Sequence, residues 1–377
     1  MKINMRYVRW AIGLGILLLA SALAAQTAVW KGKIYKDGDV TVIQNPKEPM
    51  YKGDILTLKE DLRIGGAEAK GEYSFNRILT LAVDTQENIF VLDYKDSQIK
   101  VFDKTGRFLR TIGRKGQGPG ELNGARSLSI DRTNGTLFVL ELGGRRVSCF
   151  DAQGKFIKSL PYKGDLPLTL ALDSKGRIYI QEAVLSDKES SYIFKKFTPD
   201  LASSAILIKA PTLISSTGGT DPFRPISTFA VDIKDHFIYS FPKTYEIQIF
   251  DADGKPVRRI LKEYAPIEVT SAEIDEVKKD TPPGIKMDFG KFHAAFRKFF
   301  PDNEGCIFVQ TFEKTKIGKE RVFDIFDADG RFMGTIPLTD SPILFRVGHI
   351  YSLEEDEDGY QSIKRYAVNW KINNRLN

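Results

Sequence analysis

Cysteine and histidine are scarce in this sequence. Of its 377 residues, two are cysteine and three are histidine. Cys149 and Cys306 lie 157 positions apart, which excludes a dense disulfide framework, so we expect two small buried side chains without a disulfide. His236, His293 and His349 are too few for a zinc site that draws ligands from several strands. We therefore expect no metal and no other cofactor.

Long hydrophobic runs are also missing, except at the N-terminus. Lys2, Arg6 and Arg9 precede an uncharged apolar run of 16 residues from Trp10 to Ala25. A basic start, a short apolar middle and a small-residue exit are typical of a secretory signal peptide. We predict that residues 1–24 are removed and that the chain works in the periplasm or outside the cell. Retention as an anchor is the alternative, although spanning a bilayer takes roughly 20 apolar residues.

The mature chain has no large excess of either charge. Loss of the leader removes three basic residues and no acidic one, so the formal net charge falls from +6 to +3. Proteins that hold nucleic-acid phosphates carry clustered Lys and Arg well in excess of acids. The balance argues against a nucleic-acid partner. A hydrophobic fraction of 42% also excludes disorder and favours a globular chain with a sizeable core.

A repeat runs through the chain after the leader. One half is an apolar stretch, an Asp turn and a second apolar strand, as in LTLAVDTQENIFVLD around Asp84 and SLSIDRTNGTLFVLE around Asp131. The other half is a strand that ends in Phe-Asp-x-x-Gly, as in IKVFDKTGRFLRTIG at Asp103 and IQIFDADGKPVRRIL at Asp251. Asp accepts backbone N–H bonds two residues on, and Gly supplies a positive φ. Each period therefore predicts two β-hairpins, or four strands.

The spacing of the Phe-Asp turns sets the size of the unit. Asp103 and Asp151 are 48 residues apart, and Asp251 follows 100 residues later with a degenerate copy around Thr198 between them. The aspartate of the next Phe-Asp turn, Asp327, lies 76 residues on, an excess of about 28 over one unit. Residues 270–284, TSAEIDEVKKDTPPG, account for part of it. Their Thr and Glu are spaced as a capping box and two prolines follow, so we predict a short helical insertion.

Counting first-half repeats gives five units and a weaker sixth that starts at Ile343. The sixth lacks one strand before the chain ends, and residues 54–65 precede the first full repeat. Pairing the two ends would remove free sheet edges. We predict an all-β, six-bladed β-propeller over residues 54–370, closed by the N-terminal strand, with an extension at 25–53 and a tail at 371–377.

The repeated strands, the Phe-Asp-x-x-Gly turns and the segment GRKGQGPGEL at 113–122 resemble the NHL-repeat six-bladed β-propellers, in particular the exported bacterial ones. The resemblance covers nearly the whole mature chain. It implies the architecture strongly and the chemistry weakly, since propellers of this kind include binding scaffolds, lactonases and an amidating lyase.

Candidate ligand groups follow from the topology. In each blade the first and third turns lie on one face, and the longer loops, which suit binding, lie on the other. In four blades an arginine precedes the aspartate of the first-half turn, which we call the marker aspartate. These arginines could meet at the channel mouth, where their forked donors would suit a carboxylate or phosphate. The candidates are Arg77, Tyr94, Arg126, Arg145, Arg224, Tyr245 and Arg297, with the tyrosines as flat contact surfaces. Pairing of these arginines with local acids is the alternative.

Three functions stay open at this point. A non-catalytic exported scaffold that binds a peptide, glycan or protein, preferably anionic, fits a chain without a recognisable catalytic set. A lactonase- or lyase-type enzyme and an envelope structural component are the alternatives. The acidic run 354–358 offers oxygen ligands for Ca²⁺, but it also fits a solvated loop.

Overall fold

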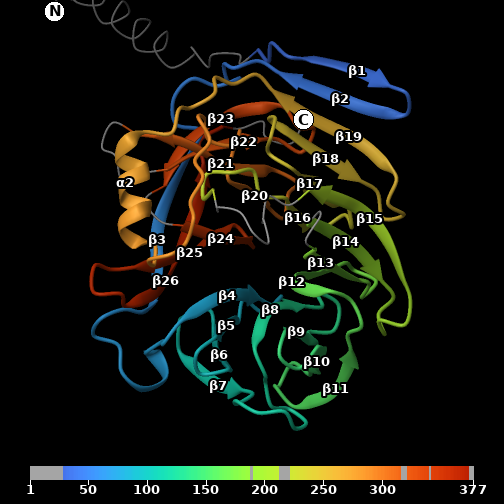
Figure 1. Ribbon diagram of the computed structural model, residues 1–377, viewed down its shortest axis with the longest axis vertical. Helices are drawn as coiled ribbons and strands as arrows, with labels where there is room; N and C mark the ends of the chain where they lie inside the picture. Colours follow the sequence, from blue (N-terminus) through green and yellow to red (C-terminus); the bar gives the residue numbers. More distant parts are fainter. Residues whose placement is uncertain (1–28, 187–189, 212–220, 316–320, 339–340, 373–377) are drawn as a thin grey trace, which may run out of the picture.

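The computed structural model describes residues 29–186, 190–211, 221–315, 321–338 and 341–372, so the expected leader lies outside the described residues. Six sheets surround a common axis (Figure 1), and each blade starts with an inner strand and ends with an outer one. The predicted all-β six-bladed propeller is confirmed. Within the described ranges, no helix has the length and apolar character needed to cross a bilayer.

Blades one to five follow the chain from the inner strand outward, and blade six takes its outer strand from the N-terminus. Blade one contains β4 (Ile78–Val83), β5 (Ile89–Asp93), β6 (Gln98–Phe102) and β7 (Phe108–Ile112). Blade two contains β8 (Ala125–Ile130), β9 (Leu137–Glu141), β10 (Arg146–Phe150) and β11 (Phe156–Pro161). Blade three contains β12 (Leu166–Leu172), β13 (Ile178–Val184), β14 (Ser191–Phe197) and β15 (Ser204–Pro211).

The remaining blades have the same plan with additions. Blade four contains β16 (Thr228–Val231), β17 (Phe237–Ser240), β18 (Glu246–Phe250) and β19 (Pro256–Lys262). Blade five contains β20 (Lys298–Pro301), β21 (Ile307–Lys314), β22 (Arg321–Phe326) and β23 (Phe332–Leu338). Blade six contains β24 (Ser341–Arg346), β25 (His349–Glu355), β26 (Gln361–Trp370) and β3 (Leu56–Gly65).

The aspartates of the repeat build the turns. Asp103 Oδ1 accepts the N–H groups of Thr105 at 2.9 Å and Arg107 at 3.0 Å, and Gly106 has a φ of 83°. Asp151 binds its own turn in the same way. These contacts satisfy backbone groups that the hairpin leaves unpaired and fix a conformation that Gly tolerates best. The repeated motif therefore serves the fold.

The hydrophobic core lies mainly between neighbouring blades. One cluster joins Phe90 and Ile99 of blade one to Leu128 and Val139 of blade two, and similar clusters join other pairs of blades. Cys149 and Cys306 are almost fully buried within these layers, as expected, and neither is joined in a disulfide. Each blade thus buries its faces against the next, which holds the inner strands at fixed positions around the axis.

The two ends of the chain close the ring. Strand β3 pairs antiparallel with β26 in a register that runs from Leu56 opposite Trp370 to Gly65 opposite Ser362. The pairing confirms the predicted closure. It gives blade six its fourth strand and leaves no open gap between the first and last blades.

An N-terminal hairpin enlarges blade four. Strands β1 (Lys33–Asp37) and β2 (Val40–Asn45) pair with each other, and β2 then pairs parallel with β19. Asn45 bonds the carbonyls of Leu261 and Gly330 and the N–H of Phe332, which ties the hairpin to both blade four and blade five. Val42 and Ile43 are buried, whereas every residue of β1 is exposed. Blade four therefore has six strands.

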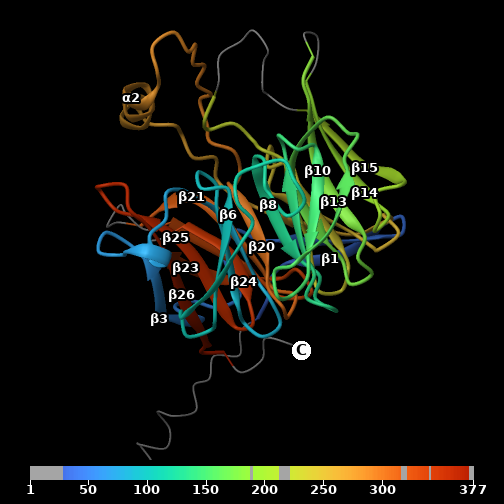
Figure 2. The ribbon, with the colours of Figure 1, turned by 90° about the horizontal axis from the view of Figure 1, so that it is seen from below.

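The predicted insertion forms helix α2 (Ser271–Asp280). The capping box between Thr270 and Glu273 is present, and the helix projects from one face of the ring (Figure 2). Glu273 also docks the helix on strand β21, because its carboxylate accepts a bond from Lys314 at 2.8 Å and contacts His293 Nε2 at 3.3 Å. The insertion thus stands on the face of the ring that carries the longer loops.

Candidate functional site

A central cavity of about 410 Å³ lies between the inner strands of all six blades. Because side chains alternate along a strand, every second residue of each inner strand points toward the axis. Small residues at the middle level, among them Ala82, Ser129, Ala171 and Ala230, leave the space open. Phe300 and Leu344 narrow it on the side of blades five and six. The scaffold therefore holds a mostly apolar chamber with polar groups at its ends, which is the usual form of a small-molecule site.

Lys298 is the charged group at the loop-side end of this cavity. It lies four residues before the marker Asp302, where the other full repeats have Thr80, Ser127, Thr169 and Thr228. Its ammonium donates to the Pro342 carbonyl at 3.1 Å and lies 5.0 Å from the centre of the Phe300 ring. Burial, together with the positive charges of Arg297 and Arg321, lowers the pKa of Lys298 to about 8.

Arg346 provides a second cation at the opposite end. Its Nε is buried and has no hydrogen-bond partner among the described residues. Burial and the nearby charge of Arg132 lower its pKa, although the guanidinium stays protonated in water at any ordinary pH. A buried donor without a partner is costly in free energy. An anionic or hydroxyl group inside the cavity would satisfy it.

Thr228 adds an unpartnered oxygen to the lining. Its Oγ1 is buried and makes no hydrogen bond with any part of the chain that the structure describes. Thr228 and Lys298 occupy the same level of neighbouring inner strands, four residues before Asp232 and Asp302. The cavity therefore offers a hydroxyl at the same level of the channel as the ammonium.

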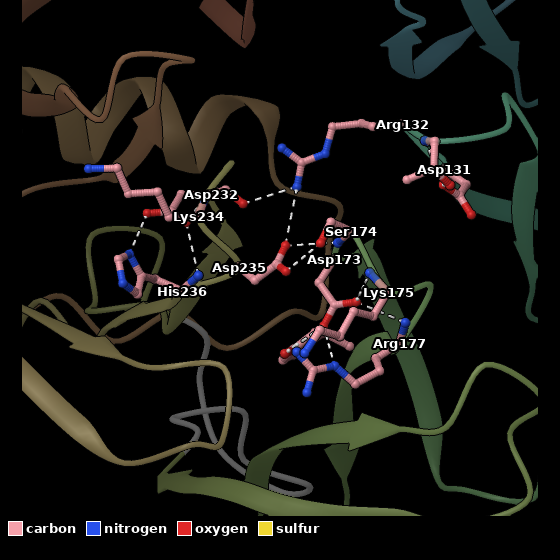
Figure 3. A network of polar contacts seen from close by, with 12 residues as sticks. Asp131, Arg132, Asp173, Ser174, Lys175, Arg177, Asp232, Lys234, Asp235 and His236 are labelled. Carbon is pink, nitrogen blue, oxygen red and sulfur yellow. Dashed lines mark hydrogen bonds and ion pairs between the residues drawn. The ribbon is translucent and has the colours of Figure 1, made fainter.

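The turn-side end is held by a polar network that crosses blades (Figure 3). Arg132 of blade two donates to the Asp232 carbonyl of blade four at 3.0 Å and lies 3.9 Å from Asp235 Oδ1. Ser174 of blade three donates its N–H to Asp235 Oδ1 at 2.8 Å. The marker carboxylates are themselves committed, since Asp232 accepts from two N–H groups of its turn and contacts His236 Nδ1 at 2.9 Å. This network fixes the end of the channel.

The cavity lining is richer in available cations than in available anions. Arg132, Lys298 and Arg346 line it together with Asp232 and Asp302. Asp302, like Asp232, accepts two N–H bonds from its own turn. The two carboxylates are thus occupied, while neither Lys298 nor Arg346 has a carboxylate within 4.0 Å among the described residues. The electrostatics favour an anionic guest.

The loops above the cavity are anchored by a buried acid at the end of the second strand in three blades. Asp93 accepts the N–H groups of Asn76 and Arg77, at 2.9 and 3.0 Å. Glu141 accepts from Asn123 N–H at 2.7 Å, and Glu182 from Asp165 N–H at 3.3 Å. All three acids have no exposed surface. Each holds the segment that leads into an inner strand, which gives the loop face a defined shape.

The structure does not gather the predicted ligand residues in one cavity, since none of the seven lines the central chamber. Arg77 and Tyr94 are neighbours, because Tyr94 N–H donates to the Arg77 carbonyl at 2.8 Å, and both side chains are exposed. Arg126 is exposed at a bulge between Ala125 and Ser127. Arg224 is half-buried and its N–H bonds the Asp221 carbonyl at 3.4 Å.

The other three candidates have structural contacts. The expectation that Tyr245 presents a flat surface to a ligand is wrong, because its ring is 4% exposed and its hydroxyl donates to Asp324 between blades four and five. Arg145 donates to the Gly164 carbonyl and so holds a loop. Arg297 is exposed and lies 5.2 Å from the centre of the Phe312 ring, next to the cavity residue Lys298.

The acidic run 354–358 forms a hairpin turn. Asp356 Oδ1 accepts the N–H groups of Asp358 and Tyr360, at 3.1 and 2.8 Å. Glu354 lies 2.7 Å from Lys364 and 3.6 Å from Arg63. Its carboxylate is thus paired with two cations. Across the described ranges, no group of three or more His, Cys, Asp or Glu side chains is arranged to hold a metal ion.

Comparison with known proteins adds information on the fold and little on chemistry. Residues 79–210 match a family described as "Domain of unknown function (DUF4934)". No curated protein matches the chain. The solved structures that resemble it include a "Putative exported protein" from Bacteroides fragilis, with a TM-score of 0.57 and 15% identity over 88% of this chain and 100% of that one.

A member of the DUF4221 family from Bacteroides vulgatus is similar as well, with a TM-score of 0.53 and 11% identity over 85% of this chain and 100% of that one. At such low identities the likeness concerns the fold alone. Sequence pattern, strand topology and these two similar structures agree that this chain is a six-bladed β-propeller, and the strand topology adds an N-terminal hairpin to blade four.

Proposed function

We propose that this chain is an exported binding protein that holds a small anionic, hydroxyl-bearing ligand in its central channel. An acidic glycan unit or the carboxylate of a peptide has this chemistry. The observation that carries the proposal is the cavity of about 410 Å³ into which Lys298 and Arg346 project without a carboxylate partner among the described residues. Charged hydrogen bonds in such a setting are worth about 1.5–3 kcal/mol each.

Rigidity supports binding by a preformed site. The inner strands are fixed by the cores between blades, and the polar network of Arg132 fixes the turn-side end. The protein then has little conformational freedom left to lose on binding, which lowers the entropic cost of holding a ligand. The apolar walls, which include Phe229 and Phe300, would pack against the carbon skeleton while the polar ends fix its orientation.

Calorimetry with a matched pair of probes tests the proposal. Gluconate and sorbitol share six carbons and a row of hydroxyls and differ in one carboxylate. We expect gluconate to bind and sorbitol to bind at least tenfold more weakly. Lys298→Met should weaken gluconate binding by about one to two decades. Lys95→Met, at an exposed loop position, is the matched control and should leave it unchanged. Equal binding of both probes would refute an anion site.

The cellular location is part of the proposal. The sequence pattern of residues 1–24 and the fold shared with a "Putative exported protein" support export. The repeats, on their sequence resemblance, are inferred to be of the NHL type. Intact-mass analysis of chain recovered from the periplasm or medium should give a start at or near Ala25, and a full-length mass would count against removal of the leader.

A further inference from the structure

Lys298 differs in its surroundings from Lys262, another lysine between two blades. Lys262 is 6% exposed and its ammonium lies 3.1 Å from Asp324, so a carboxylate neutralises it. Lys298 has the Pro342 carbonyl as its hydrogen-bond acceptor and no carboxylate within 4.0 Å among the described residues. It also faces an open cavity instead of packed side chains. The amine is therefore accessible to a small molecule and is not held in an ion pair.

Neighbouring charges favour the neutral form of this amine. The guanidinium of Arg297 is adjacent in sequence, and Arg321 begins the third strand of the same blade. Both charges and burial lower the pKa of Lys298 to about 8. A larger share of this amine than of an ordinary lysine is then unprotonated near neutral pH. A neutral amine has the lone pair that nucleophilic attack requires.

We propose that Lys298 captures a carbonyl compound bearing a carboxylate, such as a 2-oxo acid, as a covalent imine inside the channel. The Nζ lone pair adds to the carbonyl carbon, and one of the two amine protons passes to the carbonyl oxygen to give a carbinolamine. Loss of that hydroxyl and the remaining nitrogen proton as water forms the C=N bond. No oxidant or reductant takes part, and hydrolysis reverses the capture.

The surroundings select for a carbonyl compound with an acid group. The carboxylate would lie in the positive potential that Arg297 and Arg321, which do not line the cavity, exert at the Lys298 amine. The buried Thr228 Oγ1, unpartnered among the described residues, sits at the same level of the channel and would accept or donate a bond to the carbinolamine hydroxyl. This inference rests on the proposed anion site and adds a covalent step to it.

Reductive trapping tests the inference on the mature full-length chain. The protein is incubated with pyruvate and cyanoborohydride at pH 7.5, and the labelled residue is identified by peptide mapping. We expect Lys298 to be labelled at least tenfold faster than any exposed lysine and faster by pyruvate than by acetone, which lacks the carboxylate. The labelling rate should rise as the pH passes about 8.

Controls separate this inference from the proposed function and from misfolding. Lys298→Arg keeps the charge and removes the nucleophile, so it should lose the label while its thermal unfolding stays close to that of the wild type. Lys95→Met should retain the label on Lys298. If wild-type chain binds gluconate but pyruvate labels only exposed lysines, the imine is refuted and the anion site stands. If acetone labels Lys298 as fast as pyruvate, selection for an acid is refuted.

Discussion

Single carboxylate oxygens organise the outer turns of the propeller. Asp251 Oδ1 accepts the N–H groups of Asp253 and Lys255, both at 2.9 Å. Asp251→Ala would leave these N–H groups to water alone, so we expect the free energy of unfolding to fall by about 1 kcal/mol. Urea unfolding measures this change. Asp253→Ala, whose exposed side chain makes no such bond, should change stability by less than about 0.5 kcal/mol.

The same pair of variants checks the division of roles between the faces. Asp251 belongs to an outer turn and does not line the central cavity. Neither variant should alter the affinity for gluconate measured by calorimetry. A large loss of affinity in Asp251→Ala at temperatures where the variant is folded would place ligand contacts on the turn face.

The residues that surround the channel show what sequence counting missed. Counting back from the marker aspartates selected Arg126 and Arg297, yet Arg126 is the bulged residue of β8 and Lys298 is the one that lines the cavity. One position along a strand turns a side chain to the opposite face, and a bulge shifts that parity. A single sequence does not reveal a bulge. Comparing position four before each aspartate would have singled out Lys298 among hydroxyl residues.

Helix α2 shows how one acid joins an element to the ring. Glu273 caps its own helix through Thr270 and also contacts Lys314 and His293. These contacts lower its pKa to about 2. Burial lowers the pKa of His293, and because an ionised carboxylate can only accept a hydrogen bond, its Nε2–H donates to Glu273. The anchor is thus a charged carboxylate that accepts several hydrogen bonds.

We expect Glu273→Ala to lower stability by about 1 kcal/mol at pH 7, since it removes the cap and the contact with Lys314. The pKa of this carboxyl in the folded chain lies below its ordinary value of 4.5, so its ionised form contributes its full stability at a pH above 4.5. The difference in the free energy of unfolding between wild type and variant should therefore shrink as the pH falls from about 4.5 toward 2. Denaturant unfolding across that range measures it.

Glu276→Ala is the matched control for this series. Glu276 lies on the same helix with an exposed side chain. Its replacement should have a small effect at neutral pH and no comparable change on acidification. A stability difference for Glu273→Ala that persists at pH 2 would mean that packing, and not the ionised carboxylate, holds the helix.

Elements differed in how far local sequence determined them. The strands of blades one to five followed from alternation and turn residues, and α2 followed from its capping box, because these signals are local. The addition of β1 and β2 to blade four did not. Strand β2 pairs parallel with β19, so that Thr41 lies opposite Arg258. No short turn joins the two strands, and the sequence therefore carries no local signal of their pairing. Pairings between distant segments leave little trace in composition.

The ring as a whole depends on β3. Its loss would expose strand β26, including the backbone opposite Ile64 and Leu56, and would open the gap between blades six and one. We expect a chain that starts after Gly65 to unfold or to oligomerise. Circular dichroism and size-exclusion chromatography report both outcomes.

A shorter truncation is the control for closure. A chain that starts at Gly38 loses β1, whose residues are all exposed, and keeps β2 and β3. It should stay monomeric and melt close to the wild type. A chain without β3 that melts like the full-length protein would contradict the dependence of the ring on its ends.

The pairing of the first propeller strand with the last also has a consequence in time. Leu56 meets Trp370, so β3 leaves the ribosome more than 300 residues before its partner. At about 5–20 residues per second, this interval lasts roughly 15 to 60 s. During it β3 lacks its partner strand, and the edge of β2 that faces away from β1 lacks its partner until β19 is made. The edges of these first strands therefore stay exposed until their partners are made, and slower synthesis lengthens that exposure.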